Sequence, residues 1–388
     1  MTTRTVINSS ANAAVGVYVH IPFCAKKCGY CDFNAYSGYK EGTKARYVDA
    51  LCREITARAE PQTRVPTVFF GGGTPTTLSS ADLARILQTV QRAFSLEADA
   101  EITVEANPSD ADLDYLQQLR AAGFNRLSFG VQTFNDRLLK TIDRIHSGDD
   151  ARQAVARAKA AGFDNISLDL MFALPRQTMP DWEHSLDAAF ALDVPHISMY
   201  GLIVEEGTPF FARRERGKLP LPSEKTEAGM FAHAMERATA AGYQHYEISN
   251  YARPGYESRH NQIYWRNEEY FGFGAGAVSY RAGARTMNVR RPSEYIETAC
   301  ENGTAFLDDE RLGIRETMGE TIMVGLRMIQ GVSLAAFAAR FGSRAEAVFA
   351  PEIEKWTRDG LLESADGFLR LTRRGLFFAS DVMSAFLA

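Results

Sequence analysis

The most informative stretch of the sequence is His20-Ile21-Pro22-Phe23-Cys24-Ala25-Lys26-Lys27-Cys28-Gly29-Tyr30-Cys31. It places three cysteines within eight residues, separated by three residues and then by two. A short loop with this spacing can wrap around one inorganic centre, and thiolates suit zinc or an iron–sulfur cluster. A structural zinc ion would need His20 or a distant residue as its fourth ligand. A cubane cluster held by three cysteines would keep one iron open for a small molecule.

The composition limits the class of protein. The chain has 388 residues, 45% of them hydrophobic, which is enough for one large domain and a smaller one. A net charge of −5 gives no basic footprint for nucleic acid. The sequence has no apolar run of about eighteen residues, so no transmembrane helix is expected. Residues 1–14 lack the apolar core of a signal peptide and predict a disordered tail. Five cysteines, three of them clustered, fit a reducing cytoplasm better than a disulfide framework.

Short β-rich segments alternate with helical patterns along the first half of the chain. Strands are expected at residues 15–20, 65–70, 101–105, 126–131, 166–171 and 196–202. Helices are expected at residues 44–59, 80–94, 109–122, 137–142, 151–161 and 182–192. This alternation predicts an α/β fold with a parallel sheet. Six units are too few for a closed eight-stranded barrel, and a doubly wound open sheet is the alternative from the pattern alone.

Candidate functional residues recur at the carboxyl ends of these expected strands. They are His20 with the cysteines, Gly72 to Thr74, Glu105, Gln132, Asp169 and Tyr200. In barrel enzymes the active face is built from the strand ends at this side of the sheet. The recurrence therefore predicts a common site, whatever family the chain belongs to.

Each candidate also has a structural explanation. The glycines at residues 71–73 let backbone N–H groups approach an anion, or form an ordinary tight turn. Glu105 could bind an ammonium group or be a solvated strand end. Asp169 lies in a strand that reads as buried, where a carboxylate needs a partner or a ligand. Gln132 and Arg144 offer donors for a carboxylate or a ribose, although Arg144 could equally lie on the surface.

Three cysteines spaced in this way at the end of a first strand, with an aromatic residue before the third, resemble the radical S-adenosylmethionine superfamily. The resemblance implies a 4Fe–4S cluster on Cys24, Cys28 and Cys31. Its open iron would be chelated by the amino and carboxylate groups of S-adenosylmethionine, and an electron from the cluster would cleave the sulfonium to give a 5′-deoxyadenosyl radical. The resemblance also favours an open partial TIM-type (β/α)6 barrel over the doubly wound sheet.

Five segments resemble one branch of that superfamily, the oxygen-independent coproporphyrinogen III oxidases and their relatives. They are HIPFC at 20–24, GGGTPT at 71–76, EANP at 105–108, FGVQ at 129–132 and DLMFALPRQT at 169–178. The resemblance implies that the cluster-bound S-adenosylmethionine is served by Tyr18, Gly72 and Glu105. It implies a second S-adenosylmethionine, served by Gly73, Thr74, Gln132, Arg144, Asp169 and the backbone of Tyr30.

Two departures from the oxidase pattern point to its sister group, the HemW-type heme chaperones. The oxidases have a fourth cysteine two residues after the third, where this chain has Phe33, and a long N-terminal arm, whereas 23 residues precede Cys24 here. The chaperones resemble the oxidase but are thought to insert heme into apoproteins. The resemblance implies no oxidase activity and assigns no catalytic residue. The alternative is an oxidase that converts coproporphyrinogen III to protoporphyrinogen IX by two radical decarboxylations.

The string His260-Asn261-Gln262-Ile263-Tyr264-Trp265 resembles the heme-associated motif of these chaperones. An imidazole such as that of His260 can ligate heme iron, and Tyr264 and Trp265 can stack on a porphyrin, with Asn261 completing the motif. From the residue chemistry alone, a packed aromatic turn with a hydrogen-bonded histidine is the alternative. Val278 stands where we expect relatives to carry a histidine, which leaves the heme geometry open.

After about residue 310 the pattern becomes mainly helical, with helices expected at 315–329, 333–341 and 345–360 and a strand at 367–371. This predicts a winged-helix-like accessory domain that packs on the barrel, and it is not basic enough to suggest DNA binding. The expected division is a tail at 1–14, a barrel with its heme-associated extension at 15–280, a linker at 281–309 and a C-terminal domain at 310–388. The partners implied are heme and apo-hemoproteins, those of the respiratory chain included. The sequence is also compatible with peripheral membrane contact and with a homodimer.

Overall fold

A computed structural model describes residues 14–110 and 112–387. The expected tail therefore lies outside the described residues, apart from Ala14. No helix in the described ranges has the length and apolar character needed to cross a membrane.

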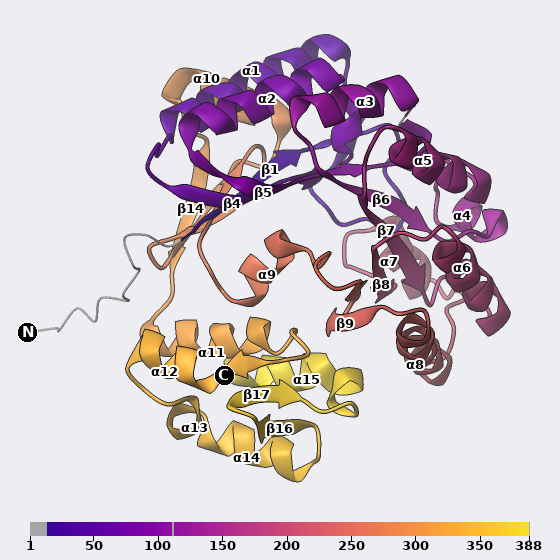
Figure 1. Ribbon diagram of the computed structural model, residues 1–388, viewed down its shortest axis with the longest axis vertical. Coiled ribbons are helices and arrows are strands. Elements are labelled where there is room, and N and C mark those ends of the chain that lie inside the picture. The colour runs from indigo at the N-terminus through magenta and orange to yellow at the C-terminus, as the bar shows by residue number, and fades with distance from the viewer. Residues whose placement is uncertain (1–13, 111, 388) are drawn as a thin grey trace, which may run out of the picture.

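Parallel strands that alternate with helices form the centre of the molecule (Figure 1). In chain order and in sheet order they are β1 (Gly16–Ile21), β4 (Arg64–Gly72), β5 (Ser95–Ala106), β6 (Arg126–Gln132), β7 (Asn165–Phe172) and β8 (His196–Gly201). The helices that line the outer side of the curved sheet are α1 (Glu41–Ala57), α2 (Ser80–Ala93), α3 (Leu113–Ala122), α4 (Asp136–Thr141), α5 (Gly148–Ala160), α6 (Met179–Ala191) and α8 (Glu224–Ala240). The short helix α7 (Pro209–Glu215) packs instead on the cysteine loop, where the Phe210 N–H donates to the Gly29 carbonyl. The prediction of an open partial barrel is confirmed.

Local sequence signals fix where these helices begin and end. The Ser79 hydroxyl accepts a hydrogen bond from the Asp82 N–H and caps the first turn of α2, as its position before the apolar pattern predicts. Gly123 ends α3 with a φ of 110°, a left-handed conformation that glycine adopts without steric cost.

The sheet continues beyond the barrel strands at both edges. On one side β11 (Tyr270–Phe273) pairs parallel with β1 and leads into antiparallel β12 (Val278–Arg281), β13 (Ala284–Asn288) and β14 (Phe306–Arg311). On the other, β8 pairs antiparallel with β10 (Asn250–Ala252), and β10 with β9 (Gln244–Glu247). Residues 281–309, expected as a linker, contain β13, part of β14 and α10 (Pro292–Asn302), which packs against α1.

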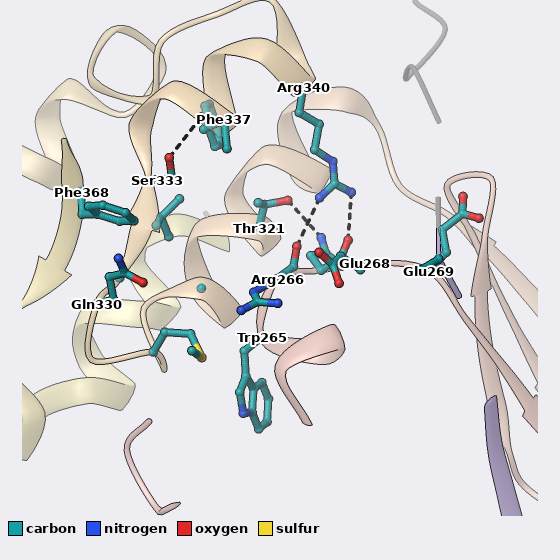
Figure 2. A pocket seen from close by; sticks show the side chains of 17 residues that line it. Trp265, Arg266, Glu268, Glu269, Thr321, Gln330, Ser333, Phe337, Arg340 and Phe368 are labelled. Atoms are coloured by element: carbon teal, nitrogen blue, oxygen red, sulfur yellow. Dashed lines mark hydrogen bonds between the residues drawn. The ribbon is translucent and has the colours of Figure 1, made fainter. Parts of the chain in front are cut away.

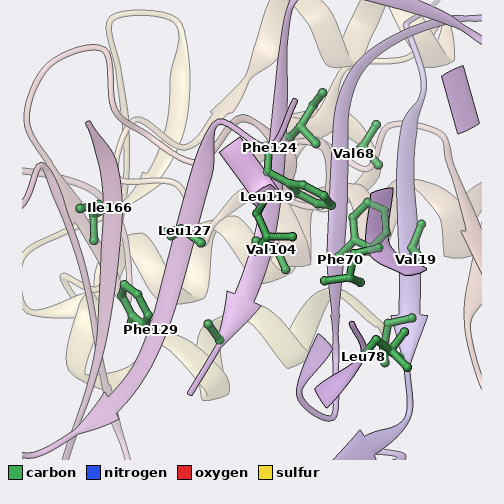
Figure 3. Close-up of a cluster of buried hydrophobic side chains, with 14 of the residues drawn as sticks. Val19, Val68, Phe70, Leu78, Val104, Leu119, Phe124, Leu127, Phe129 and Ile166 are labelled. Carbon is green, nitrogen blue, oxygen red and sulfur yellow. The ribbon is translucent and has the colours of Figure 1, made fainter. Parts of the chain in front are cut away.

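The main core lies between the sheet and its outer helices. Alternate strand residues point outward, including Val68 and Phe70 of β4 and Leu127 and Phe129 of β6, and pack against helix and loop residues such as Phe124 (Figure 3). Each such side chain contributes roughly 1.5–3 kcal/mol on full burial. The opposite, inner positions of the same strands are therefore free to carry polar side chains.

The C-terminal region forms a second core of its own. It contains α11 (Ile314–Gly325), α12 (Leu334–Phe341), α13 (Ala345–Val348), α14 (Ala350–Arg358) and α15 (Ala379–Ser384), with a small antiparallel sheet of β15 (Val332–Ser333), β17 (Phe368–Leu371) and β16 (Leu362–Ala365). The mostly helical C-terminal domain is as predicted. It lies beside α9 (Arg259–Trp265), on the inner side of the barrel sheet (Figure 1).

Candidate functional site

The carboxyl ends of the barrel strands surround a cavity of about 380 Å3, here called the cofactor cavity. The predicted residues that line it are Cys24, Cys28, Tyr30, Cys31, Gly72, Gly73, Thr74, Glu105, Gln132, Arg144, Asp169 and Tyr200. Tyr18 does not line it; its hydroxyl donates instead to Nδ1 of His20 at 2.9 Å. The structure thus brings together residues that are as far apart in the sequence as Cys24 and Tyr200.

The cysteines lie on a loop between two short parallel strands, β2 (Phe23–Cys24) and β3 (Tyr36–Ser37). The Cys31 N–H donates to the Cys28 carbonyl at 3.2 Å and closes a turn between the second and third cysteines. Cys24 Sγ lies 3.6 Å from the Thr74 hydroxyl. Burial raises the pKa of Cys24, and that of Cys31 to about 11, so metal binding must release their protons.

The donor set fits a cluster better than a zinc ion. His20, the local candidate for a fourth zinc ligand, uses both ring nitrogens: Nε2 donates to the Asn34 carbonyl at 2.9 Å, and Nδ1 accepts from Tyr18. Three thiolates without a fourth ligand suit a centre that keeps one iron open.

The glycines at the carboxyl end of β4 pack against the first strand and the cysteine loop. The N–H of Gly73 donates to the Ile21 carbonyl at 2.8 Å, and a Cβ at this position would lie 2.6 Å from the Phe23 carbonyl oxygen. Gly72 has a φ of +113°, and a Cβ there would meet the His20 ring at 2.4 Å. Both glycines are therefore required because the first strand and the cysteine loop pack directly on their backbone.

Two carboxyl groups, Glu105 and Asp169, form one wall of the cavity. Glu105 accepts the Gly72 N–H at 3.2 Å, and Asp169 accepts the Ser128 hydroxyl at 3.3 Å. Burial, reinforced by the charge of Asp169, raises the pKa of Glu105 to about 8, and burial also raises the pKa of Asp169. A cationic ligand group would stabilise their ionised forms, so the wall is suited to an ammonium or sulfonium.

Arg144 lies inside the cavity, so the alternative of a surface position is wrong. Its Nη2 donates to Asn107 Oδ1 at 2.7 Å and to the Gly130 carbonyl, and its Nη1 lies 3.8 Å from Cys28 Sγ. Asn107 in turn donates to the Thr74 hydroxyl at 3.1 Å. Arg144 therefore joins the cysteine loop to the strand ends and places a fixed positive charge in the site.

Sequence reasoning missed several polar residues that support this wall. Asn107 belongs to the segment EANP at 105–108, whose family resemblance assigns a role to Glu105 alone. Ser128 and the buried Arg126 could have been found from the sequence, because polar residues alternate with apolar ones along β6 and the polar positions face the inner side of the sheet. Ser128 pairs with Glu105 across β5 and β6, which places the two side chains on the same face.

His260 lies away from the cofactor cavity, in α9. It is 1% exposed, its Nδ1 lies 2.8 Å from the Thr67 hydroxyl, and its Nε2 lies 2.9 Å from the Tyr264 hydroxyl. Its ring also stacks on Phe69, and burial lowers its pKa to about 3. Neither ring nitrogen is free for iron in this conformation, which agrees with the alternative of a packed, hydrogen-bonded histidine.

The other residues of the motif point in different directions. Tyr264 is held by His260 and by edge-on contact with Tyr270, and the Asn261 N–H donates to the Ser258 hydroxyl in the first turn of α9. Trp265 instead faces a separate cavity next to the C-terminal domain. The structure does not gather the motif around one ligand position.

Comparison with known proteins agrees with this geometry. Residues 18–189 match the family described as the Radical SAM superfamily, and residues 315–378 match the HemN C-terminal domain. The coproporphyrinogen III oxidase HemN of Escherichia coli, a radical SAM enzyme, superposes with a TM-score of 0.86 at 25% identity, over 98% of this chain and 92% of that one.

Three relatives extend the similarity along the chain. The heme chaperone HemW of Bacillus subtilis is 42% identical, over 95% of this chain and 98% of its own length. The Escherichia coli heme chaperone HemW is 34% identical over 96% and 98%. The mitochondrial radical S-adenosyl methionine domain-containing protein 1 of Mus musculus is 35% identical over 95% and 84%.

An open α/β barrel whose strand ends converge on a three-cysteine loop defines a radical S-adenosylmethionine protein. That class implies a 4Fe–4S cluster and S-adenosylmethionine, and the residues of the cofactor cavity fit both. Within this class, the chain belongs to the HemW family of heme chaperones and their oxidase-like relatives.

Proposed function

We propose that the protein is a heme chaperone that binds heme and a 4Fe–4S cluster with S-adenosylmethionine and delivers heme to apo-hemoproteins. The observation that carries the proposal is the similarity, along nearly the whole chain, to relatives named heme chaperone HemW. The receiving apo-hemoproteins include those of the respiratory chain, and we place the protein in the cytoplasm. A homodimer and peripheral membrane contact belong to the same proposal.

In this proposal Cys24, Cys28 and Cys31 hold the cluster by their thiolates. When bound, the cluster supplies one-electron chemistry and an open iron for S-adenosylmethionine. The chain contributes positioning: Glu105 accepts the ammonium group, and the Arg144 guanidinium, fixed by Asn107, faces the ligand carboxylate or ribose.

The second S-adenosylmethionine remains a separate part of the proposal. The residues that the family resemblance assigns to it are Tyr30, Gly73, Thr74, Gln132, Arg144 and Asp169, and all of them line the cofactor cavity. Gln132 is held by the Tyr200 hydroxyl, which donates to its Oε1 at 3.0 Å. Equilibrium dialysis at saturating S-adenosylmethionine should give two bound S-adenosylmethionine molecules per cluster. A value of one would show that the second molecule is not bound.

Phe33 separates the chaperone from the oxidase alternative. It stands where the oxidases have a fourth cysteine, lines the mouth of the cofactor cavity and is 62% exposed. A phenyl ring cannot ligate iron or transfer a proton, so any step that the fourth cysteine serves in the oxidases is not available here.

An anaerobic turnover assay distinguishes the heme chaperone from the coproporphyrinogen III oxidase. Cluster-reconstituted protein is mixed with coproporphyrinogen III, S-adenosylmethionine and a low-potential reductant, and the porphyrins are separated by chromatography. We expect no protoporphyrinogen IX from protein that holds its cluster and binds heme. Product at the rate of a HemN enzyme assayed in parallel would make the protein an oxidase.

A further inference from the structure

A second cavity, of about 600 Å3, lies between the C-terminal end of α9 and the C-terminal domain (Figure 2). We call it the interdomain cavity. Its volume is within the range of roughly 300–1,000 Å3 that is typical of small-molecule sites. It is lined on the barrel side by residues 265–269, and on the other side by α11, the turn before β15, α12 and Phe368 of β17. Neither the fold nor the cofactor cavity uses this space.

The walls of the interdomain cavity are mainly apolar and aromatic. Trp265 forms one side, and Phe337 and Phe368 come from the C-terminal domain (Figure 2). The Arg327 guanidinium lies 4.2 Å from the Trp265 ring centroid and fixes that ring. The indole N–H of Trp265 is buried without a hydrogen-bond partner among the described residues. A flat aromatic ligand can stack on such walls.

Two arginines place positive charge at the same cavity. Arg266 donates to Gln262 Oε1 at 2.6 Å, and Arg340 donates to the backbone carbonyl of Asn267 at 3.0 Å. Among the described residues, neither guanidinium forms an ion pair with a carboxylate, whereas Glu269 is paired with Arg281 at 2.8 Å. Glu268 also lines the cavity; burial raises its pKa, and the charges of Arg266 and Arg340 oppose that shift. The two arginines can therefore attract an anionic ligand group, which would share them with Glu268, a carboxyl group whose burial favours the neutral form.

The cavity also offers one soft donor. Met328 lines it from the turn between α11 and β15 and is partly buried. A thioether is a known axial ligand of heme iron, and the buried position of His260 leaves no imidazole of α9 for that role.

We propose that the interdomain cavity is the heme site of this protein. The porphyrin lies between Trp265 and the phenylalanines of the C-terminal domain. Its propionates face Arg266 and Arg340, and Met328 ligates the iron. The inference rests on the proposed function and names the site at which heme is held, next to the boundary between the two domains, from which an acceptor can reach it.

The first test fills the cavity without removing any contact. Ala336 lines the cavity from an exposed position of α12, and its neighbour Ala335 is exposed but does not line it. We expect Ala336→Trp to weaken heme binding at least about tenfold, a change of about 1.4 kcal/mol, while Ala335→Trp stays within about twofold. Binding is measured by absorbance titration with hemin on the full chain, and circular dichroism verifies that both variants are folded.

The second test examines two features of the ligand separately, its propionates and its iron. Arg266→Gln should weaken binding of hemin about tenfold but leave hemin dimethyl ester, which has no carboxylates, unchanged. Met328→Leu keeps the volume and removes the sulfur, so it should shift the Soret band of bound heme and leave the affinity for metal-free protoporphyrin IX unchanged. An unchanged Soret band would remove Met328 as the ligand.

The outcomes distinguish this inference from the proposed function. If the wild-type chain binds heme and Ala336→Trp binds it equally well, the interdomain cavity is not the site and the chaperone proposal stands. If the wild-type chain does not bind heme, both the chaperone proposal and the proposed heme site are wrong. Loss of heme binding in Ala336→Trp, with normal binding in the wild type and in Ala335→Trp, supports the interdomain cavity as the heme site.

Discussion

The replacement Glu105→Gln tests the electrostatics of the cofactor cavity in the absence of any ligand. Glutamine keeps an oxygen that can accept the Gly72 N–H, but it cannot ionise. In the folded chain the pKa of Glu105 is raised to about 8, whereas the reference value is 4.5. Between these two pH values the folded state holds a proton that the unfolded state releases, so wild-type stability falls as the pH rises through this window.

The magnitude follows from the size of the pKa difference. A difference of about 3.5 corresponds to roughly 4–5 kcal/mol at pH values above 8, and water that enters the cavity reduces this to about 2–4 kcal/mol. The advantage of Glu105→Gln over the wild type should therefore be below about 1 kcal/mol at pH 5 and should reach about 2–4 kcal/mol at pH 8.5.

The assay is urea unfolding of the ligand-free chain at several pH values. Trp182 is fully buried in the barrel, so its fluorescence reports the unfolding of that domain once Trp265 and Trp356 are replaced by phenylalanine. Glu41→Gln, at an exposed position of α1, is the matched control and should show no pH-dependent advantage. An advantage of Glu105→Gln that is the same at pH 5 and pH 8.5 would refute the reasoning.

Further replacements test individual contacts of the site. Cys28→Ala leaves two thiolates and should lose most of the iron and sulfide measured in anaerobically reconstituted protein; full retention would exclude Cys28 as a ligand. Arg144→Met removes charged hydrogen bonds worth about 1.5–3 kcal/mol and should weaken S-adenosylmethionine binding in equilibrium dialysis about 10- to 100-fold, and an unchanged affinity would contradict its role. Gly73→Ala places a Cβ 2.6 Å from a backbone oxygen and should cost about 1–3 kcal/mol in chemical unfolding, whereas Gly42→Ala, with open space around it, should not; equal effects would contradict the packing argument. His260→Ala should lower stability by about 1–3 kcal/mol, because two buried hydroxyls lose their partner, and should leave the Soret spectrum of added heme unchanged; a changed spectrum would return His260 to the heme site.

The barrel was predictable because each of its strands is a compact β-rich run with a polar or glycine residue at or near its carboxyl end. Parallel strands end at the same side of the sheet, so Glu105 and Asp169 could be assigned to one site before their distance was known. The additional edge strands could not be predicted in the same way. Strand β10 has only three residues and β11 only four, and their pairing depends on partners far away in the sequence.

The remaining differences concern residues whose surroundings come from distant segments. Arg144 follows α4, and the sequence does not indicate that Asn107 and the Gly130 carbonyl will enclose its guanidinium. His260 sits in a motif that resembles a heme site, yet the hydroxyl that occupies its Nδ1 belongs to Thr67, a residue 193 positions earlier. Such contacts are set by the packing of α9 against β4, and no local pattern encodes them.

The measurement that tests the chaperone proposal most directly is heme transfer between purified proteins. The chain is loaded with heme under anaerobic conditions and mixed with the apo form of a b-type cytochrome, and the spectrum of the acceptor is followed over time. Apomyoglobin, used as a passive scavenger, gives the rate at which heme leaves spontaneously. If the protein is a heme chaperone, transfer to the cytochrome is faster than this rate and increases with acceptor concentration. A transfer rate equal to spontaneous loss at every concentration would contradict the chaperone proposal.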